Sequence, residues 1–261
     1  MLFDLISAVR SADIASVIGL LLSAAVLLLI CMPIHECAHA WAANKLGDPT
    51  GKYQGRITLN PTRHLDLIGA AGMLLFGVGF AKPVPVNMMN FKNRKRDMAL
   101  VAAAGPISNL LMGAVFAFLT SWVFFCYTKG QLIDAINSYG LSENIYAQYG
   151  VAYNDFVKAL ILGVYKISPY LLPLLTTTAS INISLAAFNL IPVPPFDGSR
   201  ILGLILPDRI YYKIMQYEQI IFYVVLALLI TGIASGPISA FIDFVYTLVY
   251  KFVSIPVSLL A

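Results

Sequence analysis

Residues 14–34 read IASVIGLLLSAAVLLLICMPI, and residues 35–39, which follow directly, read HECAH. The first stretch holds 21 residues without a charged side chain, which is long enough for a helix that crosses a membrane. The second has the pattern H-E-x-x-H, and a helix places histidines four residues apart above one another on the same face. We therefore expect one long helix, beginning near Ala12 to Ile14 and ending at about Leu46, with a polar group close to one end.

The composition of the whole chain is typical of an integral membrane protein. Of its 261 residues, 59% are hydrophobic and only 11% are charged, and the mean hydropathy is +0.80. Soluble domains are about one quarter charged. The net charge of +4 does not indicate a nucleic-acid partner, because the basic residues belong to connections, where they set orientation in the lipid bilayer. The three cysteines lie in apolar runs without a C-x-x-C pair, which favours buried thiols over disulfides.

Five more apolar segments follow the first helix, which gives about six hydrophobic segments in all. Three of them are predicted to be full spans, so that four full spans are expected: the first helix and residues 98–127, 167–196 and 219–233. The last segment, residues 237–260, carries Asp243 and Lys251, and both crossing the membrane and lying in its interface stay open.

The segment Leu67–Ala81 has only 15 residues and four glycines, which favours a re-entrant loop over a span. Before it, the alternation in Tyr53–Leu59 predicts a strand. After it, the two prolines in Lys82–Asn87 favour an extended chain. The expected fold class is thus an all-α polytopic membrane protein with a small re-entrant β-loop element, in which residues 1–261 form a single domain.

The basic residues predict the orientation. Nine of the seventeen lie between Lys45 and Arg96, which places that region on the cytoplasmic side of the membrane. If Leu67–Ala81 enters and leaves on one side, the end of segment 167–196 comes back to the same side as His39. The polar residues that follow that segment would then lie at the same depth as H-E-x-x-H.

A helical H-E-x-x-H pattern is typical of a zinc site, because two neutral imidazoles can hold one Zn²⁺ and leave other positions free. Glu36 is adjacent to the first histidine and could take a proton from a water molecule that the metal activates. A hydrolytic zinc has three protein ligands, and no other histidine is well placed, so we expect a carboxylate. Asp197 is the best candidate, because an unpaired acid next to an apolar run is costly. Asn189, in the same run, could donate a hydrogen bond to an oxyanion.

These motifs resemble the site-2 protease family of intramembrane zinc metalloproteases. That family pairs H-E-x-x-H, here residues 35–39, with N-x-x-P-x-x-x-x-D-G, here residues 189–198. The G-x-G at 77–79 resembles its re-entrant β-loop, and the G-P-x-x-N at 105–109 resembles another of its signatures. No segment is long enough for a PDZ insert, so the resemblance implies a minimal, core-only member.

One motif departs from the family. Where many relatives have H-x-D-P-x-G, Leu67 replaces the proline, and the role of His64 stays open between a structural hydrogen bond and a metal ligand.

The resemblance implies roles for particular residues. His35, His39 and Asp197 would bind a single Zn²⁺, Glu36 would be the general base and Asn189 an electrophilic helper. The implied activity is an endopeptidase that cuts single-span membrane proteins within or beside their transmembrane helices. It would act near the cytoplasmic face of a prokaryotic cell (inner) membrane.

The extended pieces of the chain are candidates for binding the unwound substrate as an added strand. The possible substrate-binding residues are Gly77, Gly79, Val84 and Val86. The alternative function is a membrane metal or proton transporter, which also places His, Asp and Glu in a membrane. Transport needs polar groups at several depths, whereas here they gather at one level.

Overall fold

The computed structural model describes residues 14–76, 81–139 and 155–258, and all regular structure within these ranges is helical. Four of the described helices are long and apolar enough to cross a membrane, and a bent pair raises the number to as many as five. The prediction of an all-helical membrane protein with several spans is confirmed. The chain forms two compact units, residues 1–112 with 181–245, and residues 113–180 with 246–261.

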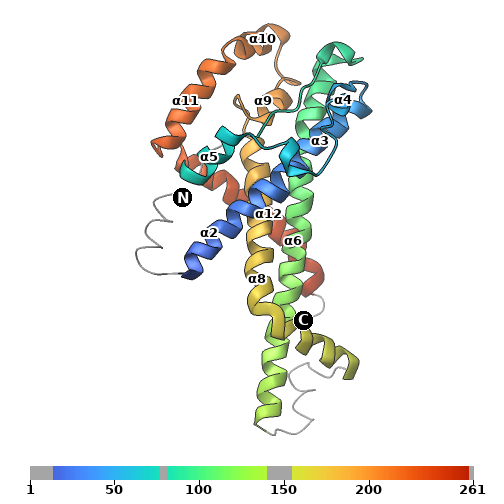
Figure 1. Ribbon diagram of the computed structural model, residues 1–261, viewed down its shortest axis with the longest axis vertical. Coiled ribbons are helices and arrows are strands. Elements are labelled where there is room, and N and C mark those ends of the chain that lie inside the picture. The colour runs from blue at the N-terminus through green and yellow to red at the C-terminus, as the bar shows by residue number, and fades with distance from the viewer. Residues whose placement is uncertain (1–13, 77–80, 140–154, 259–261) are drawn as a thin grey trace. The chain divides into compact units, whose positions relative to one another are not determined.

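The first span is an unbroken series of helical turns: α2 (Ile14–Val26), the π-helix η1 (Leu27–Cys31) and α3 (Met32–Lys45) (Figure 1). Pro33 is the second residue of α3, and a proline inside a helix lacks an amide donor and crowds the carbonyl of the preceding turn. In the wider turn before it, Met32 N–H bonds to the Leu27 carbonyl, five residues back. The single long helix expected from the sequence is therefore present, with a π turn beside its proline.

The connection after α3 contains α4 (Thr50–Tyr53) and the 3-10 helix η2 (Pro61–Arg63). The strand predicted at Tyr53–Leu59 was wrong, because that segment begins in α4 and continues in turns and bends. Two local features explain this result. Asp48 accepts hydrogen bonds from the Thr50 amide (3.1 Å) and hydroxyl (2.5 Å), which starts a helical turn, and Gly55 has φ +66°, in the left-handed region.

The segment predicted to be re-entrant contains α5 (Leu67–Phe76), whose 10 residues extend about 15 Å, half of a hydrocarbon core. Leu65 before it pairs with Ala81 after it in an antiparallel bridge, and Lys82 N–H bonds to the His64 carbonyl at 2.7 Å. Because its two ends meet, the segment leaves and returns at one place. Among the described residues this isolated bridge is all that is found of the expected β-loop, and Gly77 and Gly79 lie outside them.

After η3 (Met88–Asn90), two long helices follow, α6 (Arg94–Ser138) and α8 (Asp155–Asn189), and both units contain part of each. Within the second unit they are antiparallel. The Tyr127 and Tyr165 rings lie 5.7 Å apart, and the later Ile133 packs near the earlier Ile161. The beginning of α6 and the end of α8 therefore lie at the same end of this helix pair.

The C-terminal part consists of α9 (Asp197–Leu202), α10 (Asp208–Gln216), α11 (Glu218–Ile230) and α12 (Ser235–Ser258). α10 and α11 are bent by 65° at their junction. Within α12, the stretch Ser235–Val253 is long and apolar enough to cross a membrane. The sequence left open whether segment 237–260 crosses the membrane or lies in its interface, and this length favours crossing.

Candidate metal centre

Three predicted ligands lie together in the first unit. The Nε2 atoms of His35 and His39, from α3, are 3.0 Å apart, and Oδ2 of Asp197, the first residue of α9, lies 3.1 Å and 3.3 Å from them. Among the described residues, His35, His39 and Asp197 form the group of side chains that could hold a metal ion. Tetrahedral zinc with bonds of about 2.0–2.1 Å separates its ligand atoms by about 3.3 Å. The three donor atoms therefore fit zinc.

The Asn109 side chain, in α6, fixes the orientation of the His35 ring. Its Nδ2 donates to the Cys31 carbonyl (3.3 Å) and to Asn182 Oδ1 (2.8 Å). Both of these partners are hydrogen-bond acceptors, so they fix Nδ2 as the donor end of the Asn109 amide. The atom that lies 2.7 Å from His35 Nδ1 is therefore Asn109 Oδ1, which can only accept. His35 Nδ1 therefore carries the proton, and Nε2 keeps its lone pair for a metal.

His39 is oriented in the same way by a backbone group. Its Nδ1 donates to the Val101 carbonyl of α6 at 2.8 Å, which again leaves Nε2 as the free donor atom. Val101 comes before Asn109 in α6 whereas His39 comes after His35 in α3, so the two helices are antiparallel at the site. Both histidine residues are more than 90% buried.

Two glycines allow close packing around the site, one against the histidine rings and one against neighbouring backbone. A methyl group on Gly105 would overlap Nε2 of His39 and lie 2.7 Å from Cε1 of His35. A methyl group on Gly198 would overlap the Leu190 carbonyl oxygen, so α9 begins in direct contact with the backbone that precedes it. The glycines of the G-P-x-x-N and D-G motifs thus have a packing reason.

Glu36 is half-buried beside His35 and lies within electrostatic range of two buried side chains from the preceding connection. Arg56 is 3% exposed and donates to the Lys82 carbonyl. Burial lowers the pKa of Arg56, and the negative charge of Glu36 opposes this shift. The sequence did not single out Arg56, which the structure shows as a buried cation near the expected base.

His64 is fully buried, and its Nε2 lies 2.8 Å from the Thr58 carbonyl, to which it donates. Burial lowers the pKa of His64; the positive charge of Arg56 acts in the same direction, and the bond to Thr58 and the charge of Glu36 oppose it. His64 is absent from the group of three donors described above. The contacts of His64 therefore fit a structural hydrogen bond better than a role as a metal ligand.

Asn189 is the last residue of α8, and its Nδ2 donates to the Leu185 carbonyl one turn earlier at 2.9 Å. One amide hydrogen is thus used within the helix, and a role toward an oxyanion stays a prediction.

The segment 82–87 is held at both ends. Lys82 is bonded through both its amide and its carbonyl, as described above, and Asn87 N–H donates to Asp48 Oδ2 at 2.7 Å. Between these anchors, within the described residues, the amides and carbonyls of Val84 and Val86 have no backbone hydrogen-bond partner. The side chain of Val86 packs on the cluster of Ala42, Ala43, Phe91 and Val101.

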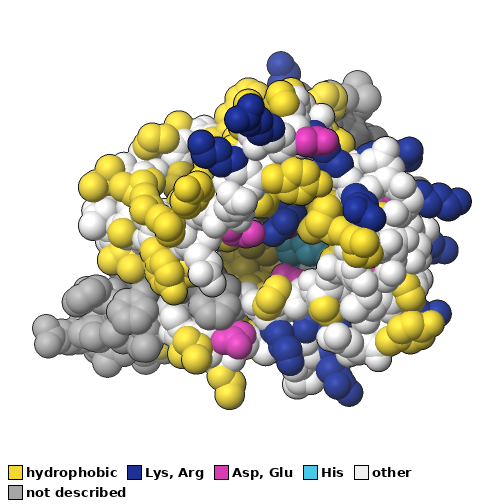
Figure 2. Space-filling model, turned by 90° about the horizontal axis from the view of Figure 1, so that it is seen from above, with side chains coloured by type: hydrophobic (Ala, Val, Ile, Leu, Met, Phe, Trp, Pro, Cys, Tyr) yellow, Lys and Arg dark blue, Asp and Glu magenta, His cyan; other side chains and the backbone are white. Residues whose placement is uncertain are grey.

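Figure 2 shows a hollow on the surface with histidine and acidic side chains visible inside it and lysine and arginine side chains around it. This face of the molecule is therefore polar inside the hollow and basic around it.

A family model described as Peptidase family M50 matches residues 23–232. The chain belongs to this family. YwhC of Bacillus subtilis (strain 168) is 34% identical to the M50 chain over 208 residues, 80% of each protein. MJ0611 of Methanocaldococcus jannaschii is 24% identical over 171 residues, 64% of this chain and 62% of that protein. Both relatives carry names that assign them, as predictions, to the zinc metalloproteases, and no solved structure matches.

Membership of M50 confirms the resemblance seen in the motifs and makes the chain a zinc metalloprotease with several candidate membrane spans. It also decides between hydrolysis and the transporter alternative, in favour of hydrolysis.

Proposed function

We propose that this chain is an intramembrane endopeptidase that uses one zinc ion to hydrolyse peptide bonds within or beside the transmembrane helix of single-span proteins. The observation that supports this most is that His35 and His39, inside one candidate span, converge with Asp197, which follows another. On this proposal residues 1–261 act as one protease domain, since α6 and α8 continue through both units.

The proposed centre lies inside the membrane but near one face. His39 precedes Lys45, the last residue of α3, by six residues, or about 9 Å along the helix. Lys45 Nζ lies 5.8 Å from the Trp41 ring, a pairing suited to the lipid–water interface. Because basic residues crowd the connection that follows, we assign this face to the cytoplasm of a prokaryotic cell.

In the proposed reaction, His35, His39 and Asp197 would hold zinc, which would act as a Lewis acid toward the scissile carbonyl and lower the pKa of water. The Glu36 carboxylate takes a proton from the attacking water and returns it to the nitrogen of the broken peptide bond. Asn189 donates a hydrogen bond to the oxyanion with its second amide hydrogen. The bonds from Asn109 and Val101 keep both imidazoles in the tautomer that the site requires.

The division between base and ligand is tested by two variants. Glu36→Gln is expected to keep its zinc and cleave no substrate, whereas Asp197→Ala is expected to lose both zinc and activity. Metal analysis of the purified proteins, with cleavage of a single-span substrate in liposomes, measures both. Full zinc content in Asp197→Ala would move the third ligand to another residue.

The substrate must expose its backbone, because a helix hides its carbonyls in its own hydrogen bonds. The unpartnered amides and carbonyls of Val84 and Val86 offer an edge on which an unwound substrate can pair, next to Gly77 and Gly79 in sequence. We therefore assign Val84 and Val86 to substrate binding.

Val84→Pro removes one donor of this edge and is expected to slow cleavage several-fold with unchanged zinc content. Val84→Ala, which keeps the amide, is the matched control and is expected to cleave at nearly the native rate. Substrates with Gly, Asn or Pro in the cytoplasmic half of the span should be cut faster than all-leucine spans. Equal rates for both substrates would rule out helix opening as a limiting step.

A further inference from the structure

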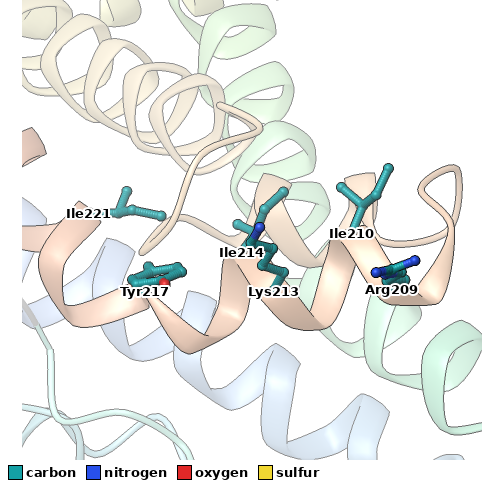
Figure 3. A pocket seen from close by; sticks show the side chains of 6 residues that line it. All are labelled: Arg209, Ile210, Lys213, Ile214, Tyr217 and Ile221. Atoms are coloured by element: carbon teal, nitrogen blue, oxygen red, sulfur yellow. The ribbon is translucent and has the colours of Figure 1, made fainter.

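An open hollow of about 510 Å³ lies at the bend between α10 and α11. Four lining residues, Arg209, Lys213, Tyr217 and Ile221, recur every four positions and so follow one face of the two helices. Figure 3 shows their side chains in this order along the ribbon, with the cations on α10 and Ile221 on α11. Ile210 and Ile214 complete the lining. The α10 end of the hollow therefore carries both cations with an isoleucine after each, and its α11 end is apolar.

The two cations of the hollow are not neutralised by neighbouring acids. Asp208 is 2.8 Å from Lys95 Nζ, and Glu218 is 2.9 Å from the Arg200 guanidinium, so both acids of α10 and the first turn of α11 are paired elsewhere. Within the described residues, Arg209 and Lys213 have no hydrogen-bond or ion-pair partner, and both are exposed. The basic end of the hollow therefore complements an anion.

Exposed tyrosines indicate how deep the bend between α10 and α11 lies in the lipid bilayer. Tyr212, Tyr217 and Tyr223 are 51%, 50% and 67% exposed. Tyrosine favours the headgroup level of a bilayer. α11, which leads away from the bend, forms a candidate span together with α10. The basic end of the hollow thus lies at headgroup level, and its apolar end leads into the hydrocarbon.

The bend is braced from α9. Arg200 bonds to Glu218 at the start of α11 and lies 3.8 Å from Met215 Sδ of α10. Gly203, which follows α9, contacts the buried ring of Tyr211 so closely that a methyl group there would lie 2.7 Å from it. The hollow is therefore preformed.

We propose that this hollow binds an anionic phospholipid, with its phosphate on Arg209 and Lys213 and its acyl chain along Ile210, Ile214 and Ile221. The occupant combines a negative headgroup with an apolar tail, which matches a lining that has its cations on α10 alone and isoleucines on both helices. The site is separate from the metal centre and does not depend on proteolysis.

Native mass spectrometry of the full chain, released from bilayers of equal phosphatidylglycerol and phosphatidylcholine, tests the site. The native chain is expected to retain one phosphatidylglycerol in preference to phosphatidylcholine. The double variant Arg209→Gln/Lys213→Gln is expected to lower this preference by about fivefold for each charge removed. The control Lys52→Gln/Lys166→Gln removes the same charge from exposed positions outside the hollow and is expected to keep the preference.

Three results would overturn the proposal. The control variant could lose as much lipid as the hollow variant, which would make the binding a general charge effect. Inorganic phosphate at millimolar concentration could displace the lipid, which would make the ligand a free anion. A dimer peak could replace the lipid adduct and disappear in the double variant, which would assign the hollow to a second copy of the chain.

Discussion

At the scale of single residues, the amide of Asn109 determines which nitrogen of His35 faces the other ligands. Asn182 holds that amide in place, and both asparagines are fully buried. Sequence reasoning overlooked Asn182, although a signal was present. It precedes Asn189 by seven residues, two helical turns, so one face of α8 carries both amides.

Replacing Asn182 with leucine is expected to weaken zinc binding by about 10- to 100-fold, as other losses of outer-shell partners do. Chelator competition measures the affinity, and the absorption spectrum of the cobalt-substituted protein reports the ligand geometry. Ser121→Ala removes a polar group whose bond stays within its own helix, and it should leave both readings unchanged. Native affinity in Asn182→Leu would make the asparagine a packing residue only.

The proposed ligands could be identified from spacing, because H-E-x-x-H on a helix and an acid after an apolar run each have a physical meaning. Asn109, Val101 and Arg56 could not be given their contacts in this way. Those contacts form only where α3 packs against α6 and where the connection after α3 folds back on itself. A local sequence pattern predicts neither of these tertiary contacts.

At the scale of elements, the contact of α6 with α3 depends on the missing side chain of Gly105. Its neighbours are the two imidazoles, which cannot move away without leaving the metal group. Helix propensity alone favours alanine over glycine by about 1 kcal/mol, so the glycine here is selected against local preference.

Gly105→Ala is expected to lose most of its zinc and to unfold at lower temperature, since overpacking of this kind costs about 1–3 kcal/mol. Gly163→Ala, in α8, is the matched control, because a methyl group there has no neighbour within 4 Å. This variant should be as stable as the native chain or slightly more stable. Zinc analysis and thermal unfolding compare the two, and a Gly105→Ala protein with full zinc would contradict the packing argument.

The lengths of apolar runs predicted the helices, because a hydrocarbon core fixes how long a span must be. The alternation of apolar and polar residues in Tyr53–Leu59 predicted a strand, and this prediction was wrong. There the side chain of Asp48 receives bonds from Thr50 nearby and from Asn87 and Asn90 far along the chain. These bonds also hold the pKa of Asp48 below its usual value, although burial acts in the opposite direction.

At the scale of the whole molecule, the asymmetry of basic residues sets the orientation. The beginning of α6 is basic, and α6 ends at Ser138. In a background without the native cysteines, Arg94→Cys is expected to react with an impermeant reagent only from the cytoplasmic side. Tyr139→Cys, 79% exposed in the native protein, should react only from outside. The opposite labelling pattern would invert the protein in the membrane.

More than half of the chain lies between His39 and Asp197. A ribosome therefore delivers both histidines and Glu36 to the membrane well before it makes the acid that completes the proposed ligand set. While the nascent chain is being inserted, the helices around the two histidines are unfolded or only partly inserted. Unfolded segments are the ones most open to hydrolysis. A protease that gains its last proposed ligand only after three candidate spans have been made is expected to stay inert until then.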